Sequence, residues 1–162
     1  MQEDSQNCYA DRMKIGIDAS RYTTETATGV EWYSYHIING LISESLKHEN
    51  TEITLYSPRE INIPKEFEHP RKVIKKILPF KRFWTLIKLS LEMCKKPTDV
   101  LFIPSHVLPL IRPDYSVITI HDVAFKYLKK SYSPHQYLYL DWSTKYAVKK
   151  AGKIIVPSQA TK

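Results

Sequence analysis

The chain has 162 residues, of which 43% are hydrophobic and 25% charged, and its formal net charge is +7 at pH 7. This length suits one domain with its own core, and the composition is that of a globular rather than a disordered or fibrous protein. Neither a membrane-spanning helix nor a secretory signal is expected. Cys8 and Cys94 are far apart and outside any ligand spacing, so we expect free thiols and a cytoplasmic setting.

The charge is distributed unevenly along the chain. Residues 1–70 carry 6 basic against 12 acidic side chains, whereas residues 71–96 carry 9 against 1 and residues 126–153 carry 7 against 1. Such asymmetry predicts a basic face that binds something anionic. Nucleic acid, a phosphorylated substrate and an anionic membrane surface remain open on this observation.

The first element of the folded domain follows a polar segment. Residues 1–12 show no periodicity and are expected to form a flexible leader, so that the domain spans residues 13–162. Ile15–Ala19 is a short apolar run that predicts a buried strand, with Asp18 near its end. A threonine-rich loop follows, and Val30–Leu46 has helical spacing, with an apolar stripe expected from Val30, Tyr33, Ile37, Leu41 and Ile42.

Gly29 lies where this helix begins. The first backbone N–H groups of a helix have no partner within it, and the helix dipole favours negative charge there. Because Gly29 has no side chain, it would let a phosphate approach these groups. The alternative is that Thr28 caps the helix and that no ligand is involved.

The middle of the chain predicts two further strands, at residues 52–56 and 73–78, before a basic helical segment. Phe83–Met93 has helical spacing, with Phe83, Ile87 and Leu91 on one stripe. The surrounding lysines and arginines in residues 71–96 allow two interpretations. The segment is either a peripheral membrane contact or an ordinary core-facing helix with a solvated basic side, and the second is favoured.

Histidines follow the next two predicted strands. Asp99–Ile103 is followed by His106, and the β-branched run Val117–Ile120 is followed directly by His121 and then Asp122. Ligands bind beyond the carboxyl ends of the strands in parallel sheets, so both histidines are expected near a binding cleft. The alternative for His121 is a strand-end histidine satisfied by a backbone carbonyl, and His106 would then cap a turn.

The last part of the chain predicts a helix from Pro134 to about Ala151, ended by Gly152, and a strand at residues 153–156. The alternation of strands and helices predicts an α/β fold with a parallel, doubly wound sheet. No metal-ligand spacing and no nucleophile-elbow motif occurs, so no metal is expected.

Five segments in this order resemble a known family. They are Met13–Arg21, Thr28–Tyr33, Asp99–His106, Val117–Val123 and Ala151–Ser158. Their succession resembles the N-terminal, acceptor-side domain of family 4 glycosyltransferases, which are retaining enzymes of the GT-B fold. The resemblance implies one Rossmann-like half of a GT-B enzyme that moves a mannosyl or glucosyl unit from a nucleotide-sugar to a glycan or lipid-linked acceptor without a metal.

The resemblance also implies roles for single residues. His121 would be the catalytic-site residue near the transferred sugar, where it positions groups and stabilises charge. Gly29 would contact the donor diphosphate through its backbone. Asp18, Arg21 and His106 would line the acceptor side.

The chain departs from the family pattern in two respects. It stops before the donor-binding domain with its Glu-x7-Glu motif, which would be supplied elsewhere, so the 162-residue chain alone is expected to have little transferase activity. Glu31 and Trp32 stand where the family loop has small and basic residues. A carboxylate close to a diphosphate would repel it, so either the Glu31 side chain points away or the loop has a weaker role.

Two other functions remain. One is a non-catalytic Rossmann-like module that binds a nucleotide or phosphorylated ligand. The other is a nucleic-acid or membrane-surface binder. Nucleic acid is not expected as a partner, because the aromatics near residues 80–84 have helical spacing and form no stacking platform, whereas peripheral contact with the inner face of the membrane through residues 71–96 stays a prediction.

Overall fold

The computed structural model describes residues 12–25 and 27–162, so the predicted leader lies outside the described residues except for Arg12. All six strands belong to one parallel sheet with the order β3-β2-β1-β4-β5-β6. The strands are β1 (Met13–Asp18), β2 (Thr51–Ser57), β3 (Val73–Ile77), β4 (Val100–Ile103), β5 (Tyr115–Thr119) and β6 (Lys153–Ile155). This is the strand order of a Rossmann-like fold, in which the sheet is wound in both directions from its centre.

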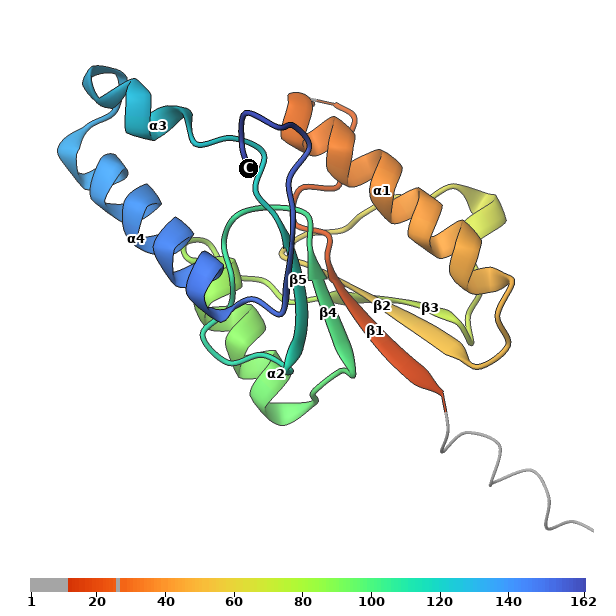
Figure 1. Ribbon diagram of the computed structural model, residues 1–162. Coiled ribbons are helices and arrows are strands. Elements are labelled where there is room, and N and C mark those ends of the chain that lie inside the picture. Colours follow the sequence, from red (N-terminus) through yellow and green to blue (C-terminus); the bar gives the residue numbers. More distant parts are fainter. Residues whose placement is uncertain (1–11, 26) are drawn as a thin grey trace, which may run out of the picture.

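Helices cover both faces of the sheet, as Figure 1 shows. They are α1 (Gly29–Leu46), a π-helical turn (Thr85–Leu89) that continues into α2 (Ser90–Lys95), α3 (Ala124–Tyr127) and α4 (Pro134–Lys150). Short 3-10 turns occur at Lys65–Phe67 and Lys129–Ser131. The prediction of an α/β fold with a doubly wound parallel sheet is therefore confirmed.

Two hydrophobic clusters lie on opposite faces of the sheet. Ile17 of β1 and Phe102 of β4 pack with Ile38 and Ile42 of α1. On the other face, the neighbouring strand residues pack under α2 and α4, and the cluster there includes Leu101, Ile103, Leu89, Met93 and Ala147. Successive residues of β4 thus alternate between the two clusters, as the pleat of a strand buried on both sides requires.

The stripe that α1 buries differs from the expected one. Its fully buried residues are Ser34, Ile38, Ile42 and Ser45, whereas Tyr33, Ile37 and Leu41 are only half-buried. Apolar residues occur on more than one side of this helix, so their spacing did not identify the side that faces the sheet. Asn39 also faces inward, where its side-chain oxygen accepts a hydrogen bond from Tyr22 at 2.7 Å.

The segment before α2 contains the clearest difference from the sequence prediction. The expected apolar stripe of Phe83, Ile87 and Leu91 is exposed, at 50%, 42% and 50%. The core side is instead formed by Leu86, Leu89 and Met93, at 7%, 0% and 2% exposed. These residues also have helical spacing, so periodicity alone could not decide which of the two stripes packs on the sheet.

Both long helices begin with a capping residue. Thr28 precedes α1, and Ser133 precedes α4 with Pro134 as its first residue. The Ser133 hydroxyl accepts a hydrogen bond from the backbone N–H of Gln136, whose side chain accepts one in return from the N–H of Ser133.

Gly152 follows α4, but it does not end the helix in the predicted way, because its φ is not positive. A Cβ there would lie 3.0 Å from the carbonyl oxygen of Asp114, so close packing requires a glycine.

Candidate functional site

A cleft of about 650 Å³ opens at the carboxyl edge of the sheet, where the strand order reverses between β1 and β4. In open α/β sheets this switch point is where ligands bind, because the loops on its two sides diverge. The cleft is lined by Ser20, Arg21, Thr28, Val30, Glu31, Pro58, Arg59, Lys81, Arg82, Phe83, Trp84, Thr85, Ser105, His106, Val107 and Tyr139. Two of the five predicted site residues, Arg21 and His106, are among them.

Asp18 lies at the end of β1 but beneath the cleft rather than on its surface. It is 1% exposed, and its two carboxylate oxygens accept hydrogen bonds from the N–H of Ser20 at 2.9 Å and the hydroxyl of Thr85 at 3.0 Å. Burial raises the pKa of Asp18, although these hydrogen bonds oppose the rise. Because Ser20 and Thr85 themselves line the cleft, Asp18 joins the two segments that form its floor.

Arg21 and Glu31 form an ion pair at the entrance to α1. The guanidinium of Arg21 lies 3.2 Å from the carboxylate of Glu31, and that carboxylate accepts hydrogen bonds from both the N–H and the hydroxyl of Thr28. The hydrogen bond from the Thr28 hydroxyl is the main reason that the pKa of Glu31 is lowered. Glu31 therefore turns back onto the start of its own helix, and a negative charge already occupies part of this helix terminus.

Gly29 is exposed at the start of α1, between Thr28 and Val30, which both line the cleft. A Cβ added to Gly29 would meet no other atom of the described residues within 4 Å. Packing within the described chain therefore gives no reason for a glycine here. The position is open to a ligand, although the cap formed by Thr28 and Glu31 agrees with the alternative that this terminus is satisfied internally.

His106 follows β4 and is half-buried in the cleft wall. Burial lowers the pKa of His106, and the positive charge of Arg21 lowers it further. The imidazole is consequently neutral at pH 7. A neutral ring can donate one hydrogen bond and accept another, which suits contact with a hydroxyl group of a ligand.

His121 follows β5, and its ring is fixed in orientation. Ring Nε2 lies 3.0 Å from the carbonyl oxygen of Pro104, and since a carbonyl only accepts, Nε2 carries the hydrogen. In the neutral ring Nδ1 then holds the lone pair. Tyr33 of α1 packs edge to face against the ring, with centroids 4.8 Å apart. This contact with the Pro104 carbonyl agrees with the alternative that His121 is a strand-end histidine satisfied by the backbone. His121 is not among the residues that line the cleft.

The basic residues of the cleft were only partly foreseen. Arg59, Lys81 and Arg82 line it together with Arg21, and Glu31 is the one carboxylate among the lining residues. Sequence reasoning assigned Lys81 and Arg82 to a helix surface. Arg59, however, follows the carboxyl end of β2 by two residues, so the rule that strand ends meet at one edge could have found it. With Glu31 paired to Arg21, the lining is positive and suits a phosphate-bearing ligand.

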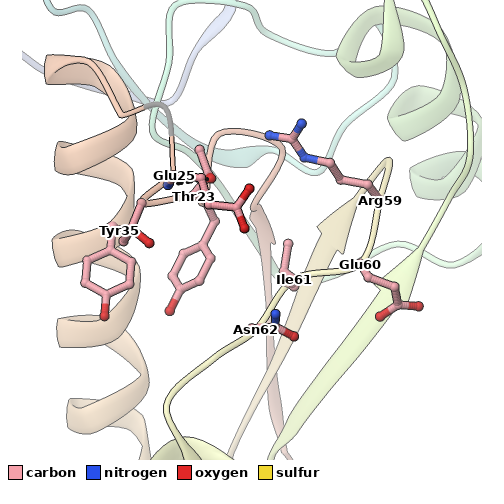
Figure 2. A pocket seen from close by; sticks show the side chains of 9 residues that line it. Thr23, Glu25, Tyr35, Arg59, Glu60, Ile61 and Asn62 are labelled. Atoms are coloured by element: carbon pink, nitrogen blue, oxygen red, sulfur yellow. Dashed lines mark hydrogen bonds between the residues drawn. The ribbon is translucent and has the colours of Figure 1, made fainter.

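A second, smaller hollow of about 220 Å³ lies beside the cleft. Figure 2 shows Tyr35 of α1 on one side of it, and Arg59, Glu60 and Asn62 from the segment after β2 on the other. Tyr22 lines it as well, and burial raises the pKa of this tyrosine to about 12. Arg59 belongs to both hollows, so its side chain separates them.

In comparisons with known proteins, no family model matches this chain, and no curated protein matches it either.

Within the described residues, no helix has the length and apolar character needed to cross a membrane. The same residues hold no group of three or more histidine, cysteine, aspartate or glutamate side chains that could bind a metal ion. Cys94 is an exposed free thiol, as expected, whereas Cys8 lies outside the described residues.

Proposed function

We propose that this chain is the acceptor-side half of a retaining glycosyltransferase of the GT-B type, in which a donor-binding domain supplies the other half of the active site. The observation that carries the proposal is the positively lined cleft at the switch point of a parallel sheet with Rossmann-like strand order. The enzyme family named in this proposal is supported by the resemblance of the five sequence segments described above. The free thiol of Cys94 agrees with a cytoplasmic location.

The chemistry of sugar transfer explains why such a cleft would be basic. The bond between the anomeric carbon and the diphosphate oxygen breaks, the acceptor oxygen forms the new bond at the same carbon, and the acceptor proton passes to the departing diphosphate. The departing diphosphate gains negative charge in the transition state, so fixed cations and N–H groups stabilise this state more than the ground state. Arg21, Arg59, Lys81 and Arg82 are the cations that this half contributes to the cleft.

The histidines take different parts in this proposal. His106 is neutral in the cleft wall and would hydrogen-bond an acceptor hydroxyl, beside Arg21. His121 would position the transferred sugar through its Nδ1, because its Nε2 is already engaged with Pro104. Asp18 would act through the loop that carries Ser20 and Arg21 and not by direct contact, since it is buried.

Binding of phosphate groups tests the cleft directly. Isothermal titration of the 162-residue chain with inorganic pyrophosphate and with a nucleoside diphosphate would compare the unchanged chain with the double variant Arg21→Gln/Arg82→Gln. Hydrogen bonds to charged groups contribute about 1.5–3 kcal/mol each, so we expect at least a tenfold weaker affinity. The control is Lys149→Gln/Lys150→Gln at the end of α4, which changes the net charge equally outside the cleft.

Equal weakening in the two double variants would show only a general charge effect and would overturn the cleft assignment. Transfer of labelled sugar then separates enzyme from binding module. The chain alone is expected to show little turnover, and normal turnover would refute the need for a donor-binding domain. A reading frame with a Glu-x7-Glu motif, next to or continuous with this one, would favour the enzyme.

A non-catalytic module that binds a phosphorylated ligand is the second candidate. The observation that favours it is that the Glu31 carboxylate accepts from the N–H of Thr28 at the start of α1, where the enzyme would hold its diphosphate, while Arg59, Lys81 and Arg82 leave the rest of the cleft positive. Such a module would bind pyrophosphate in the titration but would gain no transferase activity from any donor-binding domain.

A further inference from the structure

An apolar surface lies beside the cleft on the segment that leads into α2. We call Phe80, Phe83, Ile87 and Leu91 the exposed stripe, and their exposed fractions are 41%, 50%, 42% and 50%. Pro79, Phe80, Phe83 and Ile87, with the flanking Lys81 and Arg82, line a shallow hollow there. An exposed apolar surface of this kind marks a place where another molecule or a membrane binds.

Two other parts of the chain contact the helix that carries the exposed stripe. Leu110 and Ile111 are 50% and 46% exposed, and their backbone N–H groups donate hydrogen bonds to the Ser90 hydroxyl of α2, at 2.8 and 3.3 Å. On the other side, the ring of Phe83 lies 5.9 Å from that of Tyr139 on α4. The contact with Tyr139 therefore joins the stripe to α4 at Phe83, and the two hydrogen bonds to Ser90 join Leu110 and Ile111 to α2.

Unpaired cations surround this surface. Lys81, Arg82, Lys88, Lys95 and Lys96 form no ion pair within the described part of the chain. The single carboxylate of residues 71–96, Glu92, is paired with Lys76 and so neutralises none of them. Apolar side chains interleaved with uncompensated cations match an anionic lipid surface, where the apolar groups enter the acyl boundary and the cations contact phosphates.

We propose that the exposed stripe and its cations dock this protein on the surface of an anionic phospholipid membrane. Phe83, Lys81 and Arg82 line both this surface and the cleft, so docking places the mouth of the cleft at the level of the lipid head groups. Docking does not depend on the proposed sugar transfer, since it needs neither donor nor acceptor.

Vesicle sedimentation tests the docking surface. The full chain would be mixed with phosphatidylcholine vesicles, with and without phosphatidylglycerol, and the bound fraction measured at low and high salt. We expect binding that needs the anionic lipid and falls with salt, because cations near the surface supply much of the attraction. In Ile87→Gln/Leu91→Gln we expect about a tenfold or larger loss of partitioning, since two half-exposed aliphatic side chains no longer enter the bilayer.

The control variant is Leu128→Gln/Val148→Gln. Both residues are 56% exposed, and Val148 lies nine positions after Tyr139 on α4, on the side of the helix opposite the contact with Phe83. The control is expected to bind vesicles like the unchanged chain, and circular dichroism would verify that all variants fold.

Several results would overturn the proposal. One is no binding to anionic vesicles, and another is the same loss in the test and control variants. A third such result would come from sedimentation velocity without lipid. If the unchanged chain is a dimer and Ile87→Gln/Leu91→Gln is a monomer, the stripe binds a second copy of the chain. Duplex DNA that displaces the chain from vesicles would assign the cations to nucleic acid. The results with Ile87→Gln/Leu91→Gln do not bear on phosphate binding in the cleft, because neither residue lines it.

Discussion

Asp18 is a buried carboxylate held by two hydrogen bonds, and replacing it with asparagine tests whether the fold needs its charge or only its shape. In Asp18→Asn the side-chain oxygen still accepts from the N–H of Ser20, and the amide nitrogen donates to the hydroxyl of Thr85, which can rotate to accept. Both contacts therefore survive while the buried charge is removed. We expect Asp18→Asn to be at least as stable as the unchanged chain at pH 7.

Asp18→Ala provides the contrast. It leaves the N–H of Ser20 and the hydroxyl of Thr85 without their acceptor, and an unsatisfied polar group costs about 1–3 kcal/mol when it is fully buried. Because both groups are only half-buried, the free energy of unfolding should fall by about 2 kcal/mol, which is the sum of the two lower limits. The loop between β1 and α1, which carries Arg21, would lose its anchor to the segment before α2.

The dependence of stability on pH shows whether the charge of Asp18 stabilises or destabilises the fold. Burial raises the pKa of Asp18, so the folded chain holds this proton more tightly than the unfolded chain does. The contribution of Asp18 to stability is thus largest at low pH and decreases as the pH rises from the ordinary aspartate range through the raised pKa. Asparagine does not titrate. Its advantage over aspartate should therefore grow across this window and be small below it.

Urea denaturation followed by circular dichroism, at a series of pH values, measures both effects. The reasoning would be refuted if Asp18→Asn lost as much stability at pH 7 as Asp18→Ala, or if its difference from the unchanged chain did not vary with pH. Pyrophosphate titration of the same variants would then show whether a stable chain without this charge still binds in the cleft.

Two further predictions concern the rim of the cleft. Glu31→Ala should lower the free energy of unfolding at pH 7 by about 1 kcal/mol, because Thr28 loses its capping partner. Since the pKa of Glu31 is lowered, this loss should shrink as the pH falls through that pKa, and a constant loss in thermal unfolding would contradict it. Phe83 has φ of 55°, which only glycine adopts freely, so Phe83→Gly should be more stable than Phe83→Ala by about 1 kcal/mol. The usual order, with alanine ahead in urea denaturation, would show that the backbone relaxes there.

The strands and their common edge were predictable because few alternatives fit them. Short β-branched runs such as Val117–Ile120 have no helical period, and a crossover between parallel strands returns each strand end to the same edge. That rule placed the segments containing Asp18, His106 and His121 at one edge of the sheet. The same rule does not tell how deeply a side chain lies below the surface. The burial of Asp18 beneath the cleft is therefore known only from the structure.

The helix before α2 marks the limit of the same approach. Its residues contain two apolar stripes with equal spacing, and only the position of the preceding loop decides which stripe meets the sheet. That loop ends at Phe83, whose positive φ is unusual for an aromatic residue and has no sequence signal. The prediction for Ile87 and Leu91 was therefore wrong, and Lys81 and Arg82 of the same loop line the cleft.

The edge strand β6 has a consequence for the motion of His121. Its three residues are all exposed, yet the carbonyl of Ile155 accepts the hydrogen bond of the Ile120 N–H at 2.9 Å, immediately before the histidine. The Thr161 hydroxyl, a few residues beyond β6, donates to the carbonyl of His121 itself at 3.0 Å. Short exposed edges open most often in native-state amide exchange. Each such opening would break hydrogen bonds of the backbone next to His121, so the stability of this sheet edge and the orientation of the imidazole are linked.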